Sequence, residues 1–514
     1  MRKKLLFLFF CCAPLLSMIL PKAKAQMSLT GQLRARTEFR DGLGNPQIKD
    51  GNPAFFTSQR TRLNFGYKWD KLTFQTVIQD VRVWGQDAST ISNADGNKLM
   101  LHEAWGEVLL ATTADTNSKL KIDNLSIKVG RQELVYDDHR LLGNLDWLQQ
   151  GRRHDAALLK LLHHGYQADL GFAFNQNTDR FGYNGTAYTP GNTNPYFNSS
   201  KGIPTALPAD FVPTAGKGGA PQFVNPPNTN AGNQMYKMMQ FIYLSKKFGQ
   251  TKISTLFFKD DFAKYRLDSI GSSASPNGVV YGRRFDTQLN DLNSRITTGA
   301  FLSTQIGNAS SAGKIALNGG GYYQGGKDRD GNKLRAWHAF GYAMYQKGIF
   351  GVGPGFDILS GNNTTNPADK VNRRFDPLYG TPHKFWGFMD YYYVGTGSPA
   401  AGLQNYYLKF RVAPKDLIIS LDVHKFATQN KLIGPGTVGE MKKNLGYEFD
   451  LIVNYNINKF TNIEAGYCVY LANNSTEAAK LYSINKTEKV NQWAYLMLNI
   501  RPDFLFTKPV AIKN

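Results

Sequence analysis

Polar and apolar residues alternate with a period of two in many segments of the chain. In residues 31–40, Arg34 and Arg36 fall on one face of an extended segment, while Leu33 and Phe39 fall on the other. The same alternation recurs toward the C-terminus. Because successive side chains of a strand point to opposite faces, this pattern predicts strands that have one polar face and one apolar face.

Eighteen segments predict strands of this kind. They begin near residues 31, 56, 72, 99, 122, 152, 166, 235, 251, 292, 312, 333, 349, 403, 416, 444, 460 and 491. Each is roughly 9–14 residues long, which is enough for a tilted crossing of a bilayer. An even number of strands returns both ends of the chain to the same rim.

The connections between these segments alternate in length. Tight turns, such as residues 70–71 and 458–459, alternate with longer stretches. The longer stretches are residues 41–55, 85–98, 134–151, 177–234, 265–291, 361–402, 429–443 and 473–490. Short turns on one rim and long loops on the other are typical of bacterial outer-membrane proteins. We therefore predict an all-β fold, a transmembrane antiparallel up-and-down β-barrel with long extracellular loops and short periplasmic turns.

A soluble β-sandwich or a propeller is the alternative fold. Its charged face would be the outer one, and its connections would not alternate long with short. In lipid every backbone N–H and C=O must be paired, which a closed sheet achieves. A barrel of about 16–18 strands leaves an aqueous lumen. This size therefore indicates passage of a solute rather than a filled core.

The first residues of the chain predict export from the cell. Basic residues 2–4 precede an apolar run over residues 5–20, and Ala23 and Ala25 give the small-x-small pattern of a cleavage site. The run is shorter than the roughly 18 residues of a spanning helix. An uncleaved anchor and a lipoprotein signal are the alternatives, and Cys11 lacks the small preceding residue that a lipoprotein signal needs.

Cleavage of a signal peptide at residues 1–25 would leave residues 26–514 as a barrel in a Gram-negative type of outer membrane. The segment carries five basic residues and no acids, so the net charge falls from +21 to +16. It also carries two of the three cysteines and leaves Cys468 alone. The exported chain is therefore expected to have no intrachain disulfide and to be strongly basic.

If the apolar faces meet lipid, the polar faces meet the lumen. The basic side chains that we predict to line the lumen and bind substrate are Arg34, Arg36, Arg40, Arg60, Arg62, Arg82, Lys128, Arg131, Arg153, Lys409 and Arg411. A guanidinium matches carboxylates and phosphates and keeps its charge, and rings of Arg and Lys are how pores select anions. The sequence therefore predicts a pore that attracts anions.

Acidic residues on the same predicted faces leave a second interpretation open. These acids are Glu38, Asp80, Glu103, Glu107, Asp155, Glu448, Asp450 and Glu464. Charges in a lumen often pair across strands and stabilise the wall. In that case the excess positive charge would sit on the periplasmic turns.

Motifs for catalysis or metal binding are weak. Asp137, His139 and His154 are not accompanied by a cysteine or by an HExxH motif. Residues 321–327 resemble a phosphate-binding loop, but Asp328 replaces the required Ser or Thr. We predict that the protein is not an enzyme and has neither metal nor cofactor; a barrel hydrolase with a Ser/His pair is the remaining catalytic alternative. No motif for nucleic acid accompanies the basic charge.

Two of the long connections differ from simple hairpin loops. Residues 177–234 are rich in Asn, Pro, Gly and Thr, which indicates a long extracellular loop. Residues 361–402 include the run 384–391, which is too aromatic for a solvated loop. Either this segment folds inward as a constriction, or it forms an extra strand or a cap on the rim.

Several pieces of the chain share a pattern with one known family. They are residues 33–38 with 59–63, residues 129–134 with 138–143, Trp147 and 151–155, and residues 385–390 with 444–450. In this order they resemble the alginate-export family of outer-membrane barrels. The resemblance implies an eighteen-stranded barrel whose positively charged lumen passes a polyuronate by passive diffusion, without a cofactor.

The predicted function is an outer-membrane pore for an anionic polysaccharide or oligosaccharide. A general anion or sugar uptake porin is the main alternative, and a plugged structural or adhesin barrel is a weaker one. The predicted partners are outer-membrane lipid, the anionic saccharide and periplasmic export proteins, with the chain as a monomer. The sequence leaves the direction of transport open.

Overall fold

The computed structural model describes most of residues 26–505. The gaps are residues 86–98, 114–120, 176–195, 199–203, 209, 220–221, 223–235, 273–274, 276, 286–291, 309–311, 367–368 and 393–397. The predicted signal peptide and most of the predicted loop at 177–234 lie outside the described residues. Among the described residues, no helix is long and apolar enough to cross a membrane.

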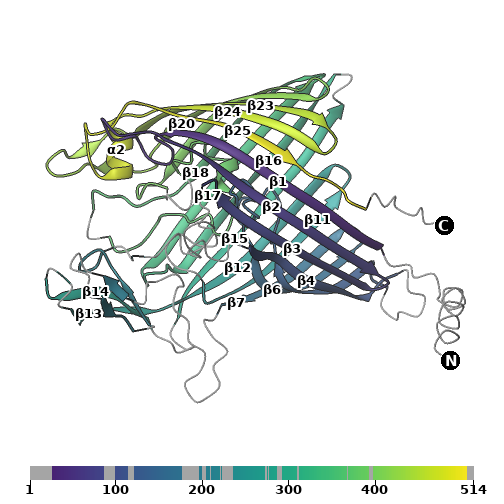
Figure 1. Cartoon of the computed structure of the whole chain (residues 1–514), viewed down its shortest axis with the longest axis horizontal. Helices are drawn as coiled ribbons and strands as arrows, with labels where there is room; N and C mark the ends of the chain where they lie inside the picture. The colour runs from purple at the N-terminus through teal and green to yellow at the C-terminus, as the bar shows by residue number, and fades with distance from the viewer. Residues whose placement is uncertain are drawn as a thin grey trace, which may run out of the picture.

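Eighteen antiparallel strands form one closed barrel, in which β1 pairs with both β2 and β25 (Figure 1). Their bounds are β1 (Gln26–Asp41), β2 (Ala54–Trp69), β3 (Leu72–Val83), β4 (Leu99–Ala111), β5 (Asn124–Gln132), β6 (His154–His163), β7 (Tyr166–Phe174), β11 (Met238–Phe248), β12 (Thr251–Ala263), β15 (Leu292–Asn308), β16 (Gly313–Lys327), β17 (Lys333–Lys347), β18 (Phe350–Leu359), β19 (Leu403–Val412), β20 (Leu417–Ala427), β23 (Asn444–Asn458), β24 (Thr461–Leu471) and β25 (Val490–Ile500). The predicted fold class and strand order are confirmed. The first strand starts at Gln26, five residues earlier than expected.

Tight turns and long loops lie at opposite ends of the barrel. Turns such as residues 70–71, 164–165 and 348–349 gather at the end where β1 begins and β25 ends (Figure 1). The long connections gather at the other end, where residues 328–332 form a short one. By the plan of outer-membrane barrels, the tight-turn rim is periplasmic and the long-loop rim extracellular.

The long-loop end carries further small elements. Their bounds are β8 (Tyr196–Asn198), β9 (Pro204–Ala206), β10 (Phe211–Pro213), β13 (Tyr265–Gly271), β14 (Val279–Phe285), the 3-10 helix η1 (Pro382–Lys384), β21 (Leu432–Ile433), β22 (Glu440–Met441) and α2 (Asn474–Leu481). Strands β10, β14 and β13 form a separate three-stranded sheet. Helix α2 begins with a capping box in which the Asn473 side chain accepts hydrogen bonds from the backbone N–H groups of Ser475 and Thr476.

The outer wall of the barrel is apolar, as lipid requires. Leu63, Phe74 and Ile78 on β2 and β3 are 43%, 39% and 37% exposed, although each is a large hydrophobic residue. The residues that alternate with these on each strand face the lumen. Val77 and Gln79 on β3 are buried there. The register of each strand therefore determines which residues face lipid and which face the lumen.

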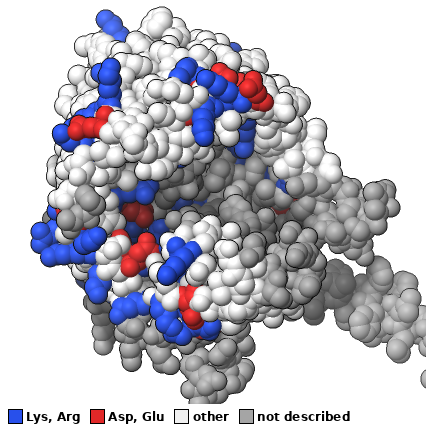
Figure 2. All heavy atoms as spheres, turned by 90° about the vertical axis from the view of Figure 1, so that its left-hand side faces the viewer, with Lys and Arg blue, Asp and Glu red and all other residues white. Residues whose placement is uncertain are grey.

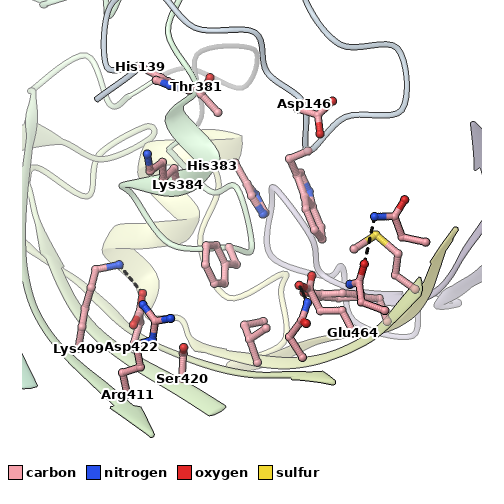
Figure 3. Close-up of a pocket in the computed structure, with 18 of the residues that line it drawn as sticks. His139, Asp146, Thr381, His383, Lys384, Lys409, Arg411, Ser420, Asp422 and Glu464 are labelled. Carbon is pink, nitrogen blue, oxygen red and sulfur yellow. Dashed lines mark hydrogen bonds and ion pairs between the residues drawn. The ribbon is translucent and has the colours of Figure 1, made fainter. Parts of the chain in front are cut away.

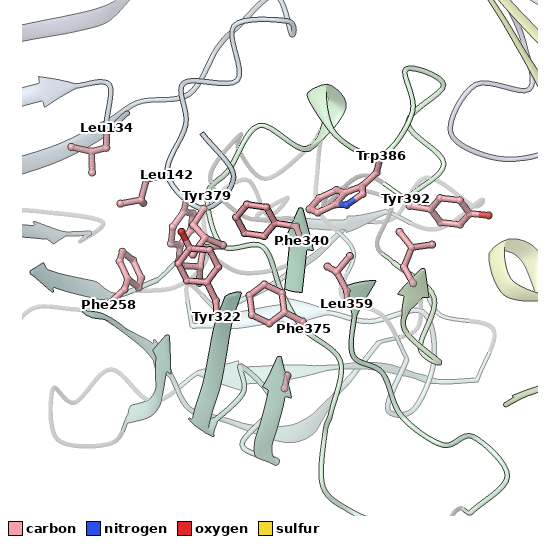
Figure 4. Close-up of a cluster of buried hydrophobic side chains, with 14 of the residues drawn as sticks. Leu134, Leu142, Phe258, Tyr322, Phe340, Leu359, Phe375, Tyr379, Trp386 and Tyr392 are labelled. Atoms are coloured by element: carbon pink, nitrogen blue, oxygen red, sulfur yellow. The ribbon is translucent and has the colours of Figure 1, made fainter. Parts of the chain in front are cut away.

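The hydrophobic core lies inside the barrel, where two long connections fold inward. Side chains within residues 133–153 and 375–392 pack on the inner faces of the strands. Figure 4 shows Phe258, Tyr322 and Phe340 of the wall against Tyr379 and Trp386 of the second connection. Of the two interpretations of residues 361–402, the inward one is confirmed. No pattern in the sequence indicated that residues 133–153 also fold inward.

Candidate functional site

Backbone hydrogen bonds join the two inward loops into one unit. The N–H of Thr381 donates to the carbonyl of His139 at 2.8 Å, and the N–H of Tyr379 donates to Leu141 at 2.9 Å. The N–H of Gly143 returns a bond to Tyr379 at 3.0 Å. A loop without regular secondary structure leaves backbone N–H and C=O groups unpaired. These bonds between the two loops replace the hydrogen bonds to water that the loops lose inside the barrel.

Arginines of β1 and β2 hold the first inward loop to the wall. Arg34 Nη1 donates to the Asp146 carbonyl at 2.8 Å, and Arg36 Nη1 donates to the Trp147 carbonyl at 3.0 Å. Arg60 Nη2 lies 2.9 Å from the Asp146 carboxylate, and the Arg60 residue is fully buried. Three of the predicted substrate-binding residues thus bind the protein's own loop.

Asp146 is the acid at the centre of this arginine group. Its carboxylate also lies 3.2 Å from Arg62 Nη1 and 3.5 Å from Arg34 Nη1. Partial burial raises the pKa of Asp146, but the charges of Arg60, Arg34 and Arg62 outweigh that effect and lower the pKa below its usual value. The carboxylate therefore stays ionised and offsets part of the positive charge.

A stack of flat side chains joins the two loops beside the lumen. The rings of Trp147 and His383 lie 4.4 Å apart and almost parallel, at 8°. Phe388 stacks on the other side of His383 at 4.9 Å, and the Arg36 guanidinium lies 4.2 Å from the Trp147 ring. Asp390 fixes His383 through a 2.9 Å hydrogen bond to Nδ1. The stack is a rigid platform built from both loops and β1.

Two carboxylates of β23 hold the second inward loop. The N–H of Met389 donates to Glu448 at 2.7 Å, and the N–H of Phe388 donates to Asp450 at 3.2 Å. Gly387 lies against the Glu448 carboxylate with a positive φ of +81°. Residues 385–390 and 444–450, which the family resemblance singled out separately, therefore meet in space.

Below the joined loops, toward the tight-turn rim, lies a cavity of about 740 Å³. Figure 3 shows His383 and Lys384 of the inward loop on one side and Lys409 and Arg411 of the wall on another. Lys409 pairs with Asp422 on the neighbouring strand. Burial, with the nearby charges of Arg140 and Lys409, lowers the pKa of Lys384, although Asp138 opposes this. The cavity combines an aromatic platform with cations.

Arg82 and Arg131 do not face the lumen, and their predicted orientation is wrong. The β2–β3 register sets Val81 opposite the inward Arg60, so Arg82 shares the outer face with Ile78. Arg131 follows Val129, which is 51% exposed on the outer wall. Strand β3 has apolar residues on both faces near its end, and Gly130 has a positive φ of +127°. Both features obscure the period-two pattern of polar and apolar residues from which the orientation was predicted.

Two of the acids that were predicted to face inward share this error. Asp80 binds Arg82 at 2.7 Å, and Asp155 binds Arg131 at 2.8 Å. Both pairs lie on the outer face of the barrel wall. The acids therefore neutralise outward arginines and do not dilute the charge of the lumen.

The remaining predicted cations lie inside or at the rim, apart from the cavity. Arg40 pairs with Glu38 at 2.9 Å, and Lys128 lies 3.7 Å from the Trp105 ring centre. Arg153, which precedes β6, lies 3.4 Å from the sulfur of Met100. The predicted basic residues therefore lie in several separate places and do not form one continuous surface.

Cations near the tight-turn rim were missed by the sequence analysis. They face inward by strand register and are Lys68, Lys247, Lys314 and Arg501, in addition to the predicted Arg411. Within the described part of the chain, none of the five forms an ion pair with a carboxylate. The same two-residue alternation could have found them, because each follows the inward parity of its strand.

Viewed from the long-loop end, the barrel is hollowed, with basic and acidic side chains around and within the depression (Figure 2). In the described ranges, no three His, Cys, Asp or Glu side chains converge as a metal site would require. The interior presents cations, aromatic rings and amide groups, which can bind a solute.

Comparisons with known proteins agree with the fold. A family model described as alginate export matches residues 25–174. Among curated proteins, no sequence relative matches the chain. The solved structure of OccAB4 from Acinetobacter baumannii is similar over 94% of this chain and 99% of that chain, with a TM-score of 0.53 at 12% identity.

Two structures from Pseudomonas aeruginosa are similar as well. OpdQ matches 93% of this chain and 98% of its own, with a TM-score of 0.50 at 12% identity. The outer membrane protein opdK matches 93% and 99%, with a TM-score of 0.50 at 9% identity. At such identities the likeness shows the barrel fold alone. The chain therefore has the fold of an outer-membrane β-barrel, and its residues 25–174 are similar to the alginate export family.

Proposed function

We propose that the pore passes an anionic polysaccharide or oligosaccharide, such as an alginate-like polyuronate, by passive diffusion. The observation that carries this proposal is the cavity beneath the inward loops. Arg411 and Lys384 border it, and so does Phe388 at the end of the Trp147–His383–Phe388 stack. Guanidinium and ammonium groups bind carboxylates, and flat rings pack on the apolar faces of sugars.

The arrangement favours weak and repeated contacts over one tight site. The inward cations Lys68, Lys247 and Lys314 lie on three separate strands near the tight-turn rim, ahead of the cavity. A pore has to release what it attracts, so several exposed charges serve passage better than one buried clamp. The buried Arg34, Arg36 and Arg60 act in this proposal as supports that set the shape of the constriction.

Ion selectivity in planar bilayers tests the role of the cavity cations. The double variant Arg411→Gln with Lys384→Gln is expected to lose anion preference in a salt gradient while it keeps a steady conductance. Lys425→Gln is the matched control, because Lys425 lies on β20 but shares the outer face with Tyr406. Equal reversal potentials for the double variant and the unmodified pore would rule out the assigned role.

Polymer block separates the proposed substrate from a general solute. Oligouronates added to one side are expected to interrupt single-channel current at lower concentrations than neutral oligosaccharides of the same length. Equal block by the two would instead favour a general sugar porin. Lack of any conductance would favour a plugged structural barrel.

A further inference from the structure

The hairpin of β16 and β17 carries three cations on its outer face, at the long-loop end. Lys327, Lys333 and Arg335 are exposed. Lys333 and Arg335 alternate with the buried residues Leu334 and Ala336, which point into the barrel, and Lys327 lies opposite Lys333. By this parity the three cations point away from the lumen. They are therefore separate from the cavity and from its proposed function.

The register places two of these charges directly opposite each other. Lys327 pairs with Lys333 across the two strands. Like charges in directly opposed positions destabilise an antiparallel pair. Such an arrangement is stable when an anion lies between the two ammonium groups.

The acids closest in sequence are engaged elsewhere. Asp328 accepts hydrogen bonds from the amides of Asn332 and Asn372. Asp330 binds Arg283 at 3.2 Å and Tyr265 at 2.6 Å. Across the described ranges, no carboxylate forms an ion pair with Lys327, Lys333 or Arg335.

Three other outward cations near the long-loop rim are neutralised by the protein itself. Arg82 binds Asp80 at 2.7 Å, Arg131 binds Asp155 at 2.8 Å, and Lys259 binds Asp261 at 2.5 Å. The β16–β17 hairpin differs from these places in leaving three neighbouring charges without such a partner. The difference indicates that a ligand supplies the negative charge.

Aromatic residues set the depth of the cations in the membrane. Tyr323 and Trp337 pair across the same two strands and are 50% and 41% exposed on the outer face. Exposed Tyr and Trp on an outer wall mark the boundary between hydrocarbon and headgroups. Arg335 and Lys333 follow toward the long-loop end, so they lie at headgroup level in the outer leaflet.

We propose that Lys327, Lys333 and Arg335 bind the phosphorylated sugar headgroup of an outer-leaflet glycolipid. The Arg335 guanidinium fits a phosphate in a bidentate manner, and the two lysines supply point charges on either side. The aromatic pair packs against the base of the headgroup. The site holds the barrel wall to its surrounding lipid.

Lipid binding to the purified full-length barrel tests the site. Native mass spectrometry is used with three probes: a phosphorylated outer-membrane glycolipid, the same glycolipid after enzymatic dephosphorylation, and phosphatidylglycerol. The unmodified barrel is expected to bind the phosphorylated glycolipid tightest. The triple variant Lys327→Gln, Lys333→Gln, Arg335→Gln is expected to bind it about tenfold more weakly.

Lys347→Gln is the matched control, because Lys347 is exposed at the tight-turn end of the same strand. It is expected to leave glycolipid binding unchanged. Equal binding by the triple variant and the unmodified barrel would overturn the site. Equal binding of phosphatidylglycerol through these residues would overturn the glycolipid assignment. Retained channel conductance shows that the triple variant is folded.

Discussion

The backbone N–H of Met389 donates a 2.7 Å hydrogen bond to the carboxylate of Glu448, and both groups are buried inside the barrel. The bond ties the second inward loop to the wall strand β23. Neighbouring Phe388 carries the stack that borders the cavity. The shape of the constriction therefore depends on a contact that lies outside the cavity itself.

Gly387→Ala is expected to displace the second inward loop. A Cβ at this position would lie 2.5 Å from the Glu448 carboxylate, and the φ of +81° disfavours any side chain. We expect a loss of about 1–3 kcal/mol in stability and a noisier open channel. Thermal unfolding and single-channel recordings measure the two effects.

Gly436→Ala is the control for backbone strain at this glycine. Gly436 also has a positive φ, +59°, but a Cβ there would meet nothing within 4 Å. It should cost less stability and leave the channel noise unaltered. Equal effects of the two substitutions would mean that backbone strain, and not the contact with Glu448, explains the loss.

Arg60→Ala is expected to release the first inward loop. Arg60 is fully buried and binds Gln32 at 2.7 Å and the Asp146 carboxylate at 2.9 Å. Because the Asp146 carboxylate is half exposed, we expect the loss of these contacts to cost about 1–3 kcal/mol. We expect larger and less regular conductance, together with protease cleavage within residues 133–153.

Arg82→Ala serves as the comparison for Arg60, since Arg82 lies on the outer face and binds Asp80 of its own strand. It should leave conductance and protease resistance unchanged. A closed, protease-resistant loop in the Arg60 variant would refute the anchoring role of this arginine.

The docking of α2 is expected to strengthen as the pH rises above neutrality. Burial, together with Arg374, lowers the pKa of Lys480 to about 7, and its ammonium group donates to the Tyr391 carbonyl. Because the unfolded segment binds more protons between about pH 7 and the usual lysine value, stability rises across that window and is lost as the pH falls to about 7. Hydrogen exchange of the α2 amides, corrected for intrinsic rates, measures this.

Lys480→Met removes the titrating group and keeps an unbranched side chain. The variant should show exchange protection that is independent of pH over the same range. The same pH dependence in the variant and the unmodified protein would assign it to another group.

Trp147→Ala is expected to weaken the block by oligouronates while it preserves the small-ion current. The substitution removes the ring that stacks on His383 at 4.4 Å, but it keeps the backbone carbonyl that binds Arg36. Concentration series of oligouronates in planar bilayers measure the effect. Trp84→Ala, at an exposed residue, should not change the block. Equal block of the Trp147 variant and the unmodified pore would show that the aromatic stack has no role in binding oligouronates.

The sequence by itself determined the barrel, because lipid and water impose opposite demands on alternate residues. Leu33 and Leu63 face lipid and Arg34 and Arg60 face the interior, as the period of two predicts. The family resemblance also located residues 385–390 and 444–450. It could not show that the two segments touch, because a hydrogen bond between Met389 and Glu448 leaves no trace in local periodicity.

The tertiary structure alone decided what the arginines do. Arg36 and Arg411 both point inward from their strands, yet Arg36 binds a loop carbonyl and Arg411 faces the cavity. The difference arises because residues 133–153 fold back into the lumen along β1 and β2. Buried contacts with strands that are distant in sequence determine the path of this loop. The alternation of residues within one strand carries no information about such contacts.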